Sequence, residues 1–165
     1  MRTLKRACRG FTLAELVVVM LVVGVLAVVA IPRFGGASEY AARGATDFVG
    51  AALRHAQKSA IAMRRNVCVG IGTTALAVTY ASAAGSSQAC AAGNTLVNPA
   101  NNLPYSDASN TLPGGATVAS ASSVVFDALG RPLSAPGTAL AAALAITVNG
   151  YATPVTIEPE TGAVH

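Results

Sequence analysis

Residues 10–15 read Gly10-Phe11-Thr12-Leu13-Ala14-Glu15, and residues 16–31 continue as the apolar run LVVVMLVVGVLAVVAI. A helix from Phe11 to Ile31 is about 31 Å long, which matches the hydrocarbon core of a bilayer. Pro32 follows at once, and proline is poorly tolerated inside a helix. The sequence therefore predicts a transmembrane helix over residues 11–32.

The carboxylate of Glu15 is the anomaly of this segment. An acid within a membrane helix costs about 2.5 to 3.5 kcal/mol, so it needs a partner or a task. Cleavage after Gly10 creates a new α-amine at Phe11, about one helical turn from Glu15 in the same chain. In an assembly, Glu15 of one chain can pair with the Phe11 amine of its neighbour and set the axial register. We therefore expect Glu15 to be an assembly residue.

The net charge of +4 comes from the first ten residues. From Phe11 onward, basic and acidic residues are equal in number, so a processed chain is near neutral. A basic segment before an apolar run follows the positive-inside rule. It predicts a cytoplasmic N-terminus and an exported remainder. The leader bases are Arg2, Lys5, Arg6 and Arg9.

The basic leader, the Gly10-Phe11 junction, Glu15 and the long apolar run resemble the class III signal of type IV pilins and type II secretion pseudopilins. This resemblance implies cleavage after Gly10 by a prepilin peptidase, N-methylation of Phe11, and filament assembly through the helix. The implied partners are other pilins or pseudopilins, the peptidase and methyltransferase, and an inner-membrane assembly platform. The implied organisation is a leader at 1–10, an assembly helix at 11–32 and a periplasmic pilin domain at 33–165.

Two other interpretations of the N-terminal segment remain open. A Sec signal peptide has a basic start and an apolar core of 7 to 15 residues before a small-residue cleavage site, which Val28 and Ala30 nearly supply. A single-pass anchor needs only the apolar run. Neither interpretation gives Glu15 a role.

Cys68 and Cys90 remain after Cys8 is removed with the leader. An even number of cysteines in an exported chain favours a disulfide over a metal or redox pair. The loop that the bond closes has about 20 residues, which corresponds to about 3 kcal/mol on the chain-entropy description. Two free buried thiols are the alternative.

The chain after Pro32 predicts a second helix at about residues 38–64 and strands from residue 66 onward. Residues 66–71 and 75–80 alternate with period two around a Gly72-Thr73-Thr74 turn, which predicts a hairpin. Residues 81–113 predict a long loop. The helix carries an apolar stripe at helical spacing: Ala45, Phe48, Val49, Ala52, Leu53, Ala56, Ala60 and Met63. Further strands are predicted at 116–119, 124–127, 144–149, 153–157 and 163–164.

This order of elements predicts an α+β, pilin-like fold, in which antiparallel strands pack on the second half of a long N-terminal helix. Residues 53–60, Val125-Phe126-Asp127 before Gly130-Arg131-Pro132, and the turn at Gly162 are similar to the FimT/GspH group, including MshC-like minor pilins. The resemblance implies a structural role as a minor pilin or pseudopilin that initiates, caps or modulates a filament.

No catalytic constellation, cofactor motif or metal-ligand spacing is visible in the sequence, so an enzyme is not expected. His55 is predicted on a helix surface, and Glu158 and Glu160 flank Pro159 in a predicted turn. The alternative function is DNA binding during DNA uptake, which needs clustered cations. The cations available for this are Arg54, Lys58, Arg64 and Arg65, with Arg131 as a loop contact.

Overall fold

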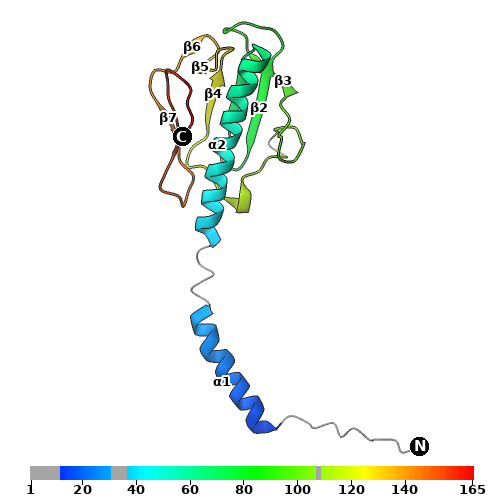
Figure 1. The fold of residues 1–165 in the computed structure, drawn as a ribbon, viewed down its shortest axis with the longest axis vertical. Coiled ribbons are helices and arrows are strands. Elements are labelled where there is room, and N and C mark those ends of the chain that lie inside the picture. The colour runs from blue at the N-terminus through cyan, green and yellow to red at the C-terminus, as the bar shows by residue number, and fades with distance from the viewer. Residues whose placement is uncertain (1–11, 31–36, 107–108) are drawn as a thin grey trace, which may run out of the picture. The chain divides into compact units, whose positions relative to one another are not determined.

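A computed structural model describes residues 12–30, 37–106 and 109–165 of the chain (Figure 1). The chain divides into two compact units, residues 1–37 and 38–165. Gly10, Phe11, Pro32 and the leader lie outside the described residues, so the processing site stays a prediction. Within the described ranges, no helix combines the length and the apolar character that a membrane span requires.

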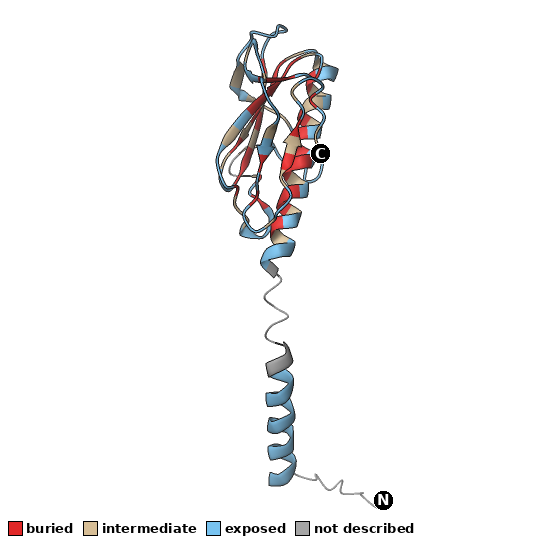
Figure 2. Cartoon of the chain, turned by 90° about the vertical axis from the view of Figure 1, so that its left-hand side faces the viewer, coloured by how far each residue is buried: buried red, intermediate tan, exposed pale blue. Residues whose placement is uncertain are grey.

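The first unit contains helix α1, Leu13–Ala30. Its side chains are exposed on every face as far as they are described, and they include nearly every large apolar residue of the run (Figure 2). A helix that is apolar all round is stable in lipid or against other apolar helices, because water cannot solvate any of its faces favourably.

The second unit is organised by α2, Ala37–Met63. One face of this helix is fully buried and the opposite face carries the charges, as Figure 2 shows by its red and pale blue sides. The buried face is built largely from small residues, which lets the helix backbone lie close to the sheet. The buried apolar side chains of this face are Ala42, Ala45, Val49, Ala52, Leu53, Ala56 and Ala60.

A six-stranded antiparallel sheet packs against α2 in the order β3-β2-β1-β4-β5-β6 (Figure 1). The predicted hairpin is present as β1 and β2, with Ile71 opposite Leu76 and the Gly72 amide donating to the Ala75 carbonyl. The strands are β1 Val67–Ile71, β2 Leu76–Ala81, β3 Cys90–Thr95, β4 Ser122–Phe126, β5 Pro132–Ala135 and β6 Thr138–Ala139.

A separate two-stranded sheet is formed by β7, Leu144–Ile146, and β8, Val155–Ile157. The turn between them contains Gly150 at φ 87°, a conformation that glycine adopts without steric cost. The C-terminal residues add to this sheet, since the His165 and Thr156 backbones exchange two hydrogen bonds of 2.7 and 3.1 Å. The architecture is therefore α+β and pilin-like, as the sequence predicts.

The core lies between α2 and the inner face of the sheet. Its largest fully buried side chain is Phe126, and the others are mainly valine, leucine and isoleucine. Along β1 and residues 76–79 of β2, buried residues alternate with half-buried ones, which is the period of a sheet with one face covered by a helix.

Four elements differ from the sequence prediction. The strand predicted at 163–164 is reduced to an isolated bridge between Val164 and Ile157. The segment predicted as a long loop, residues 81–113, contains the edge strand β3. A second strand pair, β5–β6, follows the predicted turn at Gly130 and was not expected. The strand predicted at 116–119 is reduced to an isolated bridge between Val118 and Val148.

Candidate functional site

The start of α1 positions Glu15 through a helix cap that the sequence argument missed. The backbone N–H of Glu15 donates to Oγ1 of Thr12 at 3.3 Å, and the N–H of Leu16 donates to the Thr12 carbonyl at 3.2 Å. Thr12 is therefore the N-cap, and Glu15 occupies the third helical position. The spacing Thr-x-x-Glu is the signature of a capping box and could have indicated this role.

The cap leaves the carboxylate of Glu15 in the first turn of α1. A negative charge is favourable there, because the first backbone N–H groups of a helix point toward it. Within the described residues, the Glu15 carboxylate has no ion-pair partner. The cap therefore fixes the carboxylate at the third position of an otherwise apolar helix.

The structure joins Cys68 and Cys90 through a disulfide, with the two Cα atoms 6.1 Å apart. The connection from β2 to β3, residues 82–89, is held at other points as well. Nδ2 of Asn66 donates to the carbonyls of Ser86 and Gln88 at 2.7 and 2.8 Å. Nη1 of Arg65 donates to the Ser82 carbonyl at 2.8 Å. The connection is thus fixed to Arg65 and Asn66, which lie between α2 and β1.

We expect reduction of this disulfide to lower the free energy of unfolding by about 3 kcal/mol, since the bond closes a loop with a sequence separation of 22. The measurement is chemical denaturation of the exported full-length protein in detergent, with and without reductant. A non-reducing peptide map of the same material should recover Cys68 and Cys90 in one linked pair. Two freely alkylated thiols in the exported protein would contradict the bond.

The cations predicted as DNA contacts lie toward the end of α2 and on the loop that follows β4, but three of the five are engaged by the protein itself. Nε of Arg54 donates to the Val164 carbonyl at 3.2 Å, and Arg65 holds Ser82. Arg131 pairs with the buried Asp127 at 2.8 Å. Among the described residues, Lys58 and Arg64 make no ion pair.

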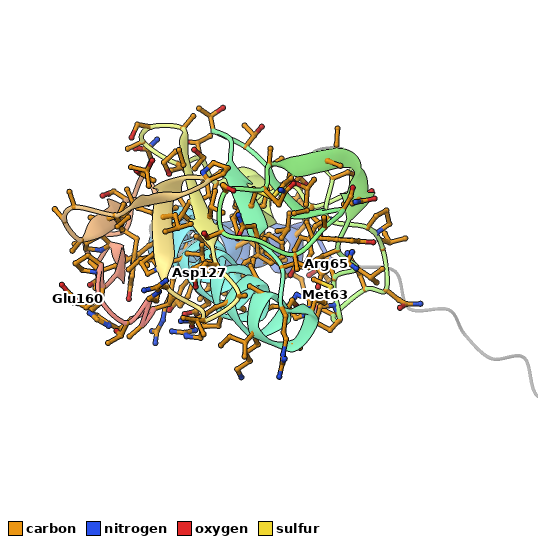
Figure 3. All side chains as sticks on the ribbon, turned by 90° about the horizontal axis from the view of Figure 1, so that it is seen from above. Met63, Arg65, Asp127 and Glu160 are labelled. Atoms are coloured by element: carbon orange, nitrogen blue, oxygen red, sulfur yellow. A yellow bond between two sulfur atoms is a disulfide. The ribbon has the colours of Figure 1, made fainter. Side chains whose placement is uncertain are left out.

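Asp127 organises the loop that follows β4. Its Oδ1 accepts the backbone N–H groups of Leu129 and Arg131 at 2.9 Å, and its Oδ2 accepts Nε of Arg131 at 2.9 Å. Figure 3 labels Asp127 between Arg65 and Glu160 in the view from above. Because the carboxylate is buried and fully used by its own loop, the role of Arg131 is to close this turn.

Arg64 ends α2 in a left-handed conformation, with φ 52°. The N–H of Arg65 donates to the Ala60 carbonyl and the N–H of Arg64 donates to the Ile61 carbonyl, at 3.2 and 3.3 Å. This pair of bonds is a Schellman motif, whose left-handed position is usually glycine. Arginine is strained there, because its Cβ crowds the backbone.

Replacing Arg64 by glycine should raise the free energy of unfolding by about 1 kcal/mol, since the left-handed conformation costs glycine least. The check is denaturant unfolding of the full chain in detergent. Arg64→Ala is the matched control, because it removes the charge but keeps the Cβ, and it should leave stability nearly unchanged. An equal gain for both variants would mean that charge repulsion, and not backbone strain, is relieved.

His55 and Glu158 are residues whose side chains could act as acids or bases. His55 is half-buried, its Nδ1 has no hydrogen-bond partner within the described structure, and its ring lies 6.0 Å from that of Tyr105. Burial lowers the pKa of His55 below its usual value, so the imidazole is neutral at pH 7. Glu158 lies 3.4 Å from the imidazole Nε2 of His165 and accepts the Gly162 N–H in a turn.

The described residues offer little support for a metal or small-molecule site. Among the described residues, no three metal-binding side chains gather in one place. An open hollow of about 270 Å³ beside Arg131 and Glu160 is smaller than the usual range for small-molecule sites.

Residues 5–31 match the family described as the prokaryotic N-terminal methylation motif. No curated protein and no solved structure matches the chain. The matched range contains the Gly10-Phe11 junction, the Thr12 cap, Glu15 and all of α1. The motif supports a type IV pilin-like structural subunit.

Proposed function

We propose that this chain is a minor pilin or pseudopilin, a structural subunit that initiates, caps or modulates a type IV pilus or a type II secretion pseudopilus. The methylation motif at residues 5–31 is the observation that carries the proposal. The exposed apolar surface of α1, with one capped acid in its first turn, supports it. The fold of the second unit agrees with a pilin domain.

In this proposal α1 first anchors the chain in the inner membrane, with the N-terminus in the cytoplasm and the second unit in the periplasm. The prepilin peptidase cuts after Gly10, and Phe11 is methylated. The helix then leaves the lipid for a bundle of neighbouring α1 helices, where its apolar surface stays out of water. Within the described residues the Glu15 carboxylate takes part in no ion pair, which leaves it available for the Phe11 amine of a neighbour.

The DNA-binding alternative has less support. A phosphate contact needs a cation that is free to approach the backbone of the nucleic acid. Arg54, Arg65 and Arg131 already donate to protein oxygens, so only Lys58 and Arg64 of the predicted set are without such a contact in the described structure. A structural role in a filament uses the N-terminal motif, which DNA binding does not require.

An intact-mass measurement of the membrane-extracted protein tests the proposal. The expected mature chain begins at Phe11 and carries one methyl group. A chain that begins at Ile31 would identify a Sec signal peptide and overturn the proposal. A chain that keeps residues 1–10 in cells with an active prepilin peptidase would identify a plain anchor.

A further inference from the structure

The connection between β7 and β8 contains the dipeptide Asn149-Gly150, and Asn149 is the one asparagine of the chain that precedes a glycine. An asparagine in this position is open to a reaction with its own backbone. The nitrogen of the following residue attacks the carbonyl carbon of the side chain, and the amide nitrogen leaves as ammonia. Glycine favours this attack, because it has no Cβ to obstruct the approach.

The backbone nitrogen of Gly150 is available for this reaction. It donates no hydrogen bond within the described structure, whereas the N–H groups on either side of it do. That of Asn149 donates to the Thr117 carbonyl at 2.8 Å, and that of Tyr151 donates to the Val148 carbonyl at 3.2 Å. Asn149 and Gly150 are both exposed, so solvent can take up the proton that the nitrogen must lose.

The side chain of Asn149 is restrained by a neighbouring segment. Its Nδ2 donates to Oγ1 of Thr117 at 2.8 Å, across 32 positions of the sequence. A cyclic imide forms only when the side chain turns its Cγ toward the Gly150 nitrogen, and this requires rotation about the Cα–Cβ bond. A side chain that is held at its amide end rotates less freely. The contact with Thr117 should therefore slow the reaction without preventing it.

We infer that Asn149 is a site of slow self-modification, and that its hydrogen bond to Thr117 sets the rate. The deprotonated nitrogen of Gly150 forms a bond to Cγ of Asn149, the bond from Cγ to Nδ2 breaks, and ammonia leaves with the proton. Water then opens the imide at either carbonyl, which gives aspartate or isoaspartate. Water is the only co-reactant, so the step needs neither an enzyme nor an oxidant.

Both products alter the contact between the small sheet and the rest of the second unit. Aspartate adds a negative charge to a processed chain whose bases and acids are equal in number, and it can no longer donate to Thr117. Isoaspartate also inserts one CH₂ group into the main chain. This connection packs on α2, since a Cβ added at Gly150 would fall 3.5 Å from Cβ of Ala42 (Figure 1). Old copies of the chain should therefore differ from new ones in charge and in the packing of this connection.

Timed peptide mapping of the purified full-length protein in detergent tests the inference. The peptide that carries Asn149 should convert into two products with a carboxyl group in place of the amide, and faster at higher pH. Asn101 is also exposed but precedes Asn102, so it is the internal control and should stay unchanged. The matched variant Asn149→Gln should also stay unmodified, because its larger ring forms poorly. An unchanged Asn149 peptide, or equal conversion at Asn101, would overturn the inference.

Thr117→Val tests the control by the hydrogen bond. Valine keeps the shape of threonine but has no hydroxyl, so conversion of the native protein should become about fivefold faster, as expected for the loss of one hydrogen bond. Thr117→Ser keeps the hydroxyl and should keep the slow rate. In concentrated denaturant the contact is absent, and all three proteins should convert equally fast. Equal native rates for wild type and Thr117→Val would overturn the role of Thr117. None of these outcomes changes the expected start of the mature chain, so the proposed function is tested separately.

Discussion

Glu15→Ala is expected to remove the chain from filaments while leaving its export and the fold of residues 38–165 unchanged. In the proposed filament the Glu15 carboxylate is buried beside a neighbour's Phe11 amine, so removing it would leave that amine buried without a partner. Truncating one partner of such a pair costs about 3 kcal/mol, which is about two orders of magnitude in binding. Cleavage and membrane insertion need no charge at this position and should proceed.

The measurement is co-purification of the chain with filament subunits at equal membrane abundance. Glu160→Ala is the matched control, since it removes an exposed carboxylate in a turn of the second unit. Equal recovery of wild type and Glu15→Ala would show that packing of the apolar helices alone drives assembly.

Glu15→Gln separates pairing from capping. Glutamine keeps the capping-box pattern with Thr12 but carries no charge. If the carboxylate pairs with an amine, Glu15→Gln should be lost from filaments as completely as Glu15→Ala. Full recovery of the glutamine variant would instead assign Glu15 to the helix cap.

Gly10→Val is expected to leave the leader on the chain. The scissile bond between Gly10 and Phe11 must enter the site of a membrane protease, and a β-branched residue both adds bulk and stiffens the backbone there. Without cleavage the Phe11 amine does not exist, so the retained leader also removes the partner of Glu15. We therefore expect no mature protein and no incorporation into filaments.

Intact mass and gel mobility of the membrane-extracted variant measure this effect. Gly10→Ala is the control, because alanine keeps a small side chain at the cut and should be processed. Normal processing of the valine variant would contradict the prediction, because it would show that the cut tolerates a bulky residue at position 10.

Local periodicity was sufficient to predict the helices and strands whose apolar residues repeat regularly along the chain. The apolar residues from Ala45 to Met63 lie on one face of a helix. The residues of β1 and β2 alternate with period two, and a glycine turn joins the two strands. Both patterns repeat over many residues, so several positions independently indicate the same helix or strand. The motif at residues 10–15 is equally local, which is why it could be recognised without any structure.

Other features depended on contacts between distant segments. The residues of β3 have low strand propensity, and this strand exists because β2 offers an edge and Cys90 is bonded to Cys68. Arg54 and Arg131 read as free cations until Val164 and Asp127 come close in space. A charge pattern shows which residues are basic, but a partner 110 positions away decides whether the cation is available.

The sequence by itself determined the N-terminal signal, the apolar α1, the stripe of α2 and the first hairpin, because each depends on neighbours within about one or two turns of chain. Only the tertiary structure decided the edge strand, the closure of the loop after β4, and the side of α2 where Tyr40 and Ile61 remain exposed. Those features arise from the packing of α2 on the sheet, which covers one face of the helix and leaves the other available.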